Sequence, residues 1–102
     1  MASGKEYLAF VLEQCPDGTI CRSMMGEYVL YYQGRVFGGI YNNRLLVKPV
    51  KAAVARMPDA VYELPYEGAK TMILVNRIDD RSFLKELLEA MLPELSPPKK
   101  KK

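Results

Sequence analysis

The sequence contains no histidine, and cysteine occurs only at Cys15 and Cys21. Without histidine the chain lacks the commonest general base at neutral pH, the usual activator of serine and cysteine nucleophiles, and the most frequent transition-metal ligand. The two cysteines are separated by five residues, unlike the close pairs of zinc and redox sites, and no second pair completes a four-ligand zinc site. We therefore expect a protein that is not an enzyme, with no catalytic residue, no metal site and no cofactor.

Two cysteine alternatives stay open. Arg22 adjoins Cys21 and could lower the pKa of a nucleophilic thiol, but neighbouring side chains on a strand point to opposite faces. A disulfide between Cys15 and Cys21 would span the turn Pro16-Asp17-Gly18 and act as a redox switch. Free cysteines are most often simply buried, so the favoured interpretation is two reduced structural thiols.

No stretch of the sequence is apolar over the ~20 residues that a membrane helix needs. The first residues also lack the basic start, apolar run and small-residue cleavage site of a secretory signal. A cytoplasmic protein with no membrane association is expected. At 102 residues, 49% of them hydrophobic, the chain has the size and composition of one folded domain.

The formal charge of +3 depends on the C-terminus, where Lys99–Lys102 supply four of the fifteen basic residues. Eleven basic residues then face twelve acidic ones in the rest of the chain. The basic isoelectric point is thus a property of the tail, and it is weak evidence for nucleic-acid binding.

Short β-type runs separated by two-residue turns fill the segment from Met24 to Lys48. Gln33-Gly34 and Asn42-Asn43 tolerate the positive φ of primed hairpin turns. The pattern predicts an antiparallel meander with strands at Thr19–Met24, Glu27–Tyr32, Arg35–Tyr41 and Arg44–Lys48.

Adjacent glycines, Gly38 and Gly39, interrupt the third predicted strand. Glycines in this position indicate a bulge, a bend, or a group that presses close to the backbone. Together with Gly34 they resemble a phosphate-binding loop, but no helix begins after them to hold a phosphate. Turn and bulge chemistry is the simpler interpretation.

Three helices flank the strands in the predicted order. Ser3 and Glu6 form a capping box that starts the first helix, Val50–Met57 has high helix propensity without a side-chain cap, and Asp79 is the expected N-cap of the last helix. Paired carboxylates at Asp79-Asp80 are explained by this cap rather than by catalysis or cation binding. That last helix carries an apolar stripe of Phe83, Leu84, Leu87, Leu88, Met91 and Leu92.

Extended segments at Val61–Leu64 and Thr71–Asn76 complete the element order, with three or four strands before the middle helix and one or two after it. The sequence predicts an α+β fold, a two-layer sandwich of helices on a mostly antiparallel sheet, with helices at the start, middle and end. Residues 1–95 form the single expected domain, and residues 96–102 form a flexible lysine-rich tail.

Aromatic residues concentrate on the predicted strands: Tyr28, Tyr31, Tyr32, Phe37 and Tyr41. An aromatic sheet face can stack nucleic-acid bases. The nearby basic residues are only Arg35, Arg44 and Lys48, and aromatic pairs also stabilise a sheet or a protein interface. Weak nonspecific nucleic-acid binding through the lysine tail and these aromatics is the alternative to protein binding.

Several segments together resemble the N-terminal domain of the TfoX/Sxy competence regulators. They are Met24-Met25-Gly26-Glu27-Tyr28, Leu30-Tyr31, Gly34, Phe37-Gly38-Gly39-Ile40, Leu45-Leu46-Val47-Lys48, Met57-Pro58-Asp59-Ala60 and Pro65-Tyr66-Glu67-Gly68-Ala69-Lys70. The resemblance implies helices packed on an antiparallel sheet and a loose link to transcriptional control of natural competence. Larger members carry a further helical domain that this sequence lacks. Departures from the pattern are Ser23, in place of a basic or bulkier residue, and Val50, in place of a helix-capping Ser or Thr.

We therefore expect a stand-alone, non-enzymatic regulatory module that binds a protein, with the transcription machinery as the partner that the resemblance implies. Aromatic anchors beside a few charges suit such interfaces. The expected contact residues are Tyr28, Tyr31, Tyr32, Tyr66, Glu67 and Lys70.

Overall fold

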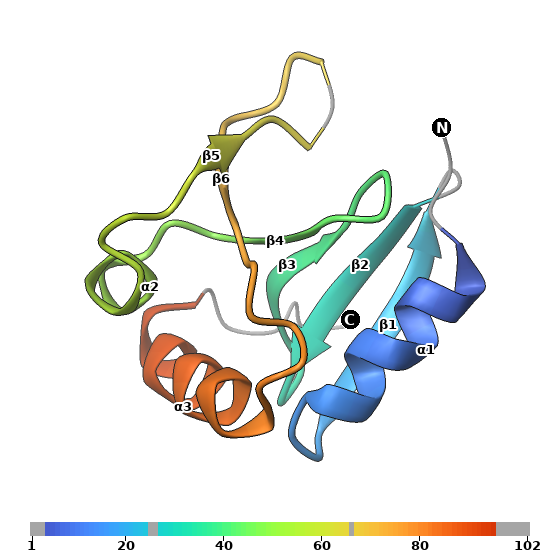
Figure 1. Cartoon of the computed structure of the whole chain (residues 1–102), viewed down its shortest axis with the longest axis horizontal. Helices are drawn as coiled ribbons and strands as arrows, with labels where there is room; N and C mark the ends of the chain where they lie inside the picture. The colour runs from blue at the N-terminus through green and yellow to red at the C-terminus, as the bar shows by residue number, and fades with distance from the viewer. Residues whose placement is uncertain (1–3, 25–26, 66, 96–102) are drawn as a thin grey trace, which may run out of the picture.

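The computed structural model describes residues 4–24, 27–65 and 67–95 (Figure 1). In this part of the chain the helices are α1 (Lys5–Gln14), α2 (Lys51–Arg56) and α3 (Arg81–Met91), and α3 continues into a 3₁₀ turn, η1 (Leu92–Glu94). The strands are β1 (Thr19–Met24), β2 (Glu27–Tyr32), β3 (Arg35–Ile40), β4 (Leu45–Val47), β5 (Tyr62–Glu63) and β6 (Met72–Leu74).

All six strands form one sheet in the order β1-β2-β3-β4-β6-β5, and every neighbouring pair is antiparallel. The predicted α+β class is confirmed, with the meander and with helices at the start, middle and end. The number of strands after α2, which the sequence left open, is two. The lysine-rich tail, residues 96–102, lies outside the described residues.

Two of the predicted hairpin turns have the expected backbone. Gln33 and Gly34 have φ values of 55° and 82°, and Asn42 and Asn43 have 55° and 58°. Positive φ at both central residues defines the primed turn whose twist matches that of the flanking strands. The turn predicted at residues 25–26 lies outside the described residues.

The glycine pair in β3 shows two of the three alternatives that the sequence left open, a bulge and neighbouring groups that press against the backbone. The register of β2 with β3 shifts between Leu30 and Tyr31, which marks a bulge. A Cβ on Gly38 would lie 2.8 Å from the Cα of Val47, and one on Gly39 would lie 2.7 Å from the ring of Tyr41. Only glycine fits at these two positions without displacing a neighbour.

One face of the sheet forms the core with all three helices. The register places Leu30, Ile40, Leu45, Val47 and Ile73 on this face. Against them pack buried helix residues: Val11 of α1, Ala53 of α2, and Phe83, Leu84, Leu87, Leu88 and Met91 of α3. Figure 1 shows α1 alongside β1, and α2 beside α3 at the other end of the sheet.

The first two helices begin without a side-chain cap of their own. α1 has Gly4 as N-cap, whose amide donates to Oδ1 of Asn43 at 2.8 Å; the predicted capping residue Ser3 lies outside the described residues. α2 starts after Val50, which offers no acceptor. The amide of Ala52 instead donates to Oε1 of Glu94, 2.9 Å away in η1. Distant parts of the chain therefore satisfy these helix ends.

The N-cap of α3 is Asp80, so the prediction of Asp79 was wrong by one residue. Oδ1 of Asp80 accepts from the amide of Phe83 at 3.0 Å, and Oδ2 accepts from Arg77 at 3.2 Å. These hydrogen bonds favour the charged carboxylate and hold the pKa of Asp80 below its ordinary value. The pattern of adjacent aspartates did not reveal which one caps, because both have a side chain of the same type.

Replacing Gly38 with alanine is expected to destabilise the protein. The added Cβ meets backbone atoms of β4, which cannot rotate away, so we expect Gly38→Ala to lower the free energy of unfolding by about 2–3 kcal/mol. Urea denaturation followed by circular dichroism measures the change. Gly4→Ala is the control, because its Cβ would lie 3.7 Å from Oδ1 of Asn43, which is an ordinary van der Waals contact. Equal stability of the two variants would contradict the close packing at Gly38.

The carboxylate of Asp80 makes stability depend on pH in the acid range. Because its pKa is lower in the folded state, its contribution is complete above the ordinary Asp value of about 3.9 and is lost as the pH falls through the folded value. Asp80→Asn keeps a capping oxygen but cannot titrate, so it should flatten this part of the pH profile. Asp79→Asn is the matched control. If Asp79→Asn changed the dependence of stability on pH and Asp80→Asn did not, the assignment of Asp80 as the titrating cap would be refuted.

Candidate functional site

The face of the sheet opposite the helix-covered core is left uncovered by the described helices. We call it the open face. By register and alternation it comprises Ile20, Arg22 and Met24 of β1, Glu27, Val29 and Tyr31 of β2, Val36 and Gly39 of β3, Leu46 of β4, Glu63 of β5, and Met72 and Leu74 of β6. Most of these side chains are apolar, whereas a sheet face exposed to water usually alternates to polar residues.

Burial on the open face falls from its centre to the β1 edge. Leu46 is fully buried although it is not part of the helix-covered core cluster. Val29, Tyr31 and Val36 are half-buried. At the edge, Ile20 and Met24 are 56% and 54% exposed. The open face therefore presents a graded, largely apolar surface that carries Tyr31 and, beside Gly39, the ring of Tyr41, a composition typical of protein interfaces.

The predicted tyrosines of β2 separate between the two faces. Tyr31 lies on the open face, paired with Ile20 and Val36. Tyr32 is buried in the helix-covered core, and Tyr28 is half-buried against that core. The alternation of side chains along a strand is the physical reason. Among the three, only Tyr31 belongs to the open face.

The other predicted contact residues lie at the far end of the sheet. Tyr66 is outside the described residues, while Glu67 and Lys70 are exposed in the loop between β5 and β6, which extends away from the sheet in Figure 1. Four strand spacings separate β2 from β5, which is roughly 19 Å at 4.8 Å per step. The structure therefore does not bring Tyr31 together with this loop.

A second exposed apolar group, which the sequence analysis missed, surrounds β5. Val61, Tyr62 and Leu64 are each about half exposed, at 51%, 47% and 48%. In the sequence, the segment from Val61 to Leu64 is apolar except for Glu63. Pro58 and Pro65 flank this segment, and nearby prolines indicate an edge strand. An edge strand exposes side chains that a central strand would bury.

Two of the basic residues near the strands, Arg44 and Arg35, make intramolecular bonds. Arg44 forms an ion pair with Glu63 and donates to the carbonyl oxygens of Tyr41 and Leu64 at 3.1 and 3.3 Å. Arg35 donates to the carbonyl oxygen of Leu92 at 3.1 Å, at the end of α3. These guanidinium groups connect the β5 edge and the last helix to the sheet. Their hydrogen bonds within the protein leave them less available to bind a ligand.

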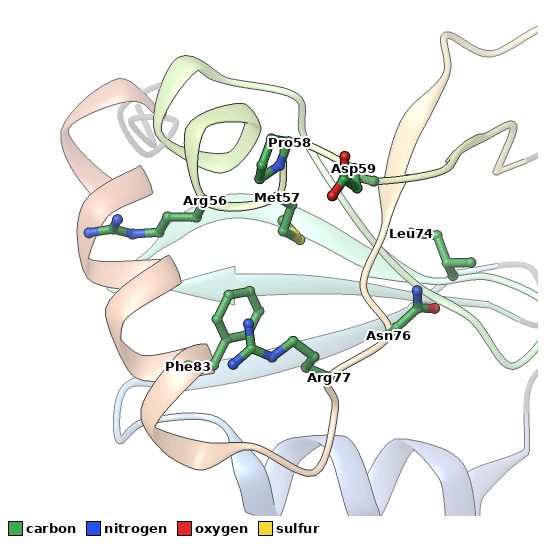
Figure 2. A pocket seen from close by; sticks show the side chains of 9 residues that line it. Arg56, Met57, Pro58, Asp59, Leu74, Asn76, Arg77 and Phe83 are labelled. Carbon is green, nitrogen blue, oxygen red and sulfur yellow. The ribbon is translucent and has the colours of Figure 1, made fainter.

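A shallow pocket of about 180 Å³ lies between α2, β6 and the start of α3 (Figure 2). Its apolar lining includes Met57, Leu74 and Phe83, and its polar lining includes Arg56, Asp59, Asn76 and Arg77. The pocket has no signature in the sequence, because its lining comes from three separate stretches, within residues 56–60, 74–77 and at 83.

The two arginines of the pocket lie apart from each other (Figure 2). The guanidinium of Arg77 stacks over the ring of Phe83, 4.2 Å from its centroid, and pairs with the capping Asp80. In Figure 2 the guanidinium of Arg56 points away from Arg77. The lining contains no hydroxyl or thiol nucleophile, and arginine stays protonated at neutral pH. This arrangement does not assemble an acid and a base around a reacting atom.

Both cysteines pack against the core. Cys15 follows α1, and burial raises the pKa of its thiol to about 11. Cys21 pairs with Leu30 on the helix-covered side, whereas its neighbour Arg22 lies on the open face, as the strand alternation predicts. Among the described residues, no cluster of three or more His, Cys, Asp or Glu side chains could hold a metal ion.

None of the helices in residues 4–24, 27–65 and 67–95 combines the length and the apolar composition that crossing a bilayer requires.

Comparison with known proteins connects the chain to one relative. No family model and no solved structure matches it. It is 31% identical over 105 residues to an uncharacterized 12.7 kDa protein in the trpE 5′ region of Spirochaeta aurantia, and the match covers 100% of this chain and 91% of the relative. The chain belongs to the same family as this spirochaete protein.

Proposed function

We propose that the protein is a non-enzymatic, cytoplasmic interaction module of the TfoX/Sxy N-terminal type, and that it acts by binding another protein. The observation that carries the proposal is the apolar open face, on which Tyr31 stands among half-buried aliphatic side chains. A regulatory role connected with transcription follows from the sequence resemblance alone, and the fold class agrees with it.

The chemistry of the open face favours a protein partner. Burial of Val29, Tyr31 and Val36 by a partner would remove a contiguous apolar surface from water, which is the main source of affinity in protein association. An aromatic residue with few rotatable bonds, such as Tyr31, is a typical anchor. The loop residues Glu67 and Lys70 would then belong to a second, separate contact region.

Nucleic-acid binding has less support from the described residues. Such binding depends on cations free to approach phosphates. Arg44 is held by Glu63 and by carbonyl oxygens, and Arg35 is held at the end of α3. Of the strand aromatics, Tyr32 and Phe37 are buried in the helix-covered core and offer no ring for stacking. The open face retains Tyr31 and a basic residue, Arg22, at its edge.

Removal of the Tyr31 ring should weaken partner binding. In affinity capture with the immobilised protein, we expect Tyr31→Ala to lose the partner that the parent protein retains, with an affinity at least about tenfold lower once that partner is purified. Val54→Ala is the matched control, because Val54 is a 39% exposed apolar residue on α2. Glu67→Ala and Lys70→Ala test the distant loop separately.

Circular dichroism must first show that each variant is folded. Retention of every captured protein by folded Tyr31→Ala, together with losses in the loop variants, would move the contact region to Glu67 and Lys70. Equal retention by all variants would refute both proposed regions.

The buried thiol of Cys15 should react slowly, as expected for a structural rather than a catalytic cysteine. A pKa of about 11, against an ordinary value of 9.0, reduces the thiolate fraction about a hundredfold. In Cys21→Ser, where Cys15 is the remaining thiol, alkylation by iodoacetamide should be slow in the native protein and fast in denaturant. Rapid alkylation of native Cys15 would contradict a buried, protonated thiol and would reopen the enzyme alternative.

A further inference from the structure

The two edges of the sheet differ in how well they are protected against strand addition. β5 is two residues long and lies between Pro58 and Pro65. β1 is six residues long and pairs with β2 in continuous register from Thr19–Tyr32 to Met24–Glu27, with no bulge. It contains no proline and no lysine. Proteins usually protect edge strands by charged residues, by proline, by bulges or by shortness, and of these features β1 has only the charge of Arg22.

We propose that β1 pairs with β1 of a second copy of this chain, antiparallel across a two-fold axis, so that the two sheets become continuous. Pairing of this kind satisfies backbone N–H and C=O groups on the free edge of each strand. A two-fold axis suits it, because the same strand then serves as both donor and acceptor surface. The proposed interface uses the edge of the sheet, and it is independent of whether Tyr31 binds a partner.

Charge and side-chain pairing favour a register centred on Cys21. In this register Thr19 faces Ser23 of the second copy, and Ile20 faces Arg22 of the second copy. A register centred on Arg22 would instead place two guanidinium groups directly opposite each other, which destabilises a strand pair. Both registers keep the two open faces on the same side of the joined sheet, because odd-numbered residues pair with odd-numbered ones.

The register also accounts for an exposed apolar side chain. Ile20 is 56% exposed in the single chain. In the pair, the aliphatic stem of Arg22 from the second copy would cover it, while the guanidinium stays in water. Hydroxyl pairs such as Thr19 with Ser23 are among the favourable cross-strand neighbours. The strand is therefore complementary to itself without bringing like charges together.

Sedimentation equilibrium of the full chain at micromolar concentrations tests the pairing. We expect a dimer, and we expect Ile20→Lys to raise its dissociation constant at least about tenfold, since lysine is the residue that natural edges use against pairing. Val61→Lys is the matched control, because Val61 is a 51% exposed apolar residue beside the other edge strand. A monomeric parent protein, or a dimer dissociated by Val61→Lys and not by Ile20→Lys, would overturn the proposal.

Cross-linking tests the register independently. In Cys15→Ser, treatment with copper phenanthroline should join two Cys21 side chains: each thiol loses a proton, and two electrons pass to the added oxidant as the S–S bond forms. Cys21→Ser, which retains Cys15, should give no covalent dimer. A dimer whose Cys21 residues fail to cross-link would overturn the register centred on Cys21.

The same measurements separate this inference from the proposed function. Tyr31→Ala leaves the backbone of β1 intact, so this variant should remain dimeric even as it loses the captured partner. Conversely, a monomeric Ile20→Lys together with a dimeric Tyr31→Ala identifies the β1 edge, rather than the open face, as the dimer contact. Loss of the dimer in Tyr31→Ala together with its persistence in Ile20→Lys would assign dimerisation to the open face and overturn the edge pairing.

Discussion

Burial of one face of a single antiparallel sheet beneath three helices is the constraint on which this structure depends. The helices are short, and α2, at six residues, is below the length at which an isolated helix is stable in water. Each helix therefore persists because its apolar side chains are covered by the sheet. The sheet in turn needs the helices, because Leu30, Val47 and Ile73 would otherwise face water.

Long-range hydrogen bonds complete the elements that this packing brings together. Glu94 accepts from an amide at the start of α2, and Asn43 accepts from the amide of Gly4, the N-cap of α1. Arg35 donates to the carbonyl oxygen of Leu92 at the end of α3. Each bond joins residues far apart in the chain. The ends of the helices are thus determined by the same arrangement that buries the core, and the loss of one layer would leave polar backbone groups of the other unsatisfied.

Several polar side chains are bonded within the fold, and this limits which groups are available on the surface. The arginines at positions 35, 44 and 77 hold carbonyls, a carboxylate or a ring within the fold, and Cys15 is protonated by burial. Two surfaces are left over: the largely apolar open face around Tyr31, and the edge of β1 with its backbone N–H and C=O groups. Binding of protein surfaces is the activity that such groups support best, and both proposals rest on these two surfaces.

Local pattern was enough to predict the meander, the positive φ of its two-residue turns, the tight packing at Gly38 and Gly39, and the helix order. These features depend on neighbours in sequence, such as the period-two alternation and the small set of residues that accept positive φ. The position of a cap was less predictable, since Asp79 and Asp80 offer the same oxygen acceptor and only the backbone geometry selects Asp80.

Other features of the structure depend on how segments far apart in the sequence pack together. The split of the β2 tyrosines between two faces follows from alternation, but which face the helices cover depends on where their apolar stripes dock, so Tyr32 rather than Tyr31 became buried. The roughly 19 Å between β2 and β5 results from the strands β3, β4 and β6, which lie between them in the sheet. Exposure of an edge is likewise a property of the whole sheet, because no strand carries in its own residues the identity of its neighbours.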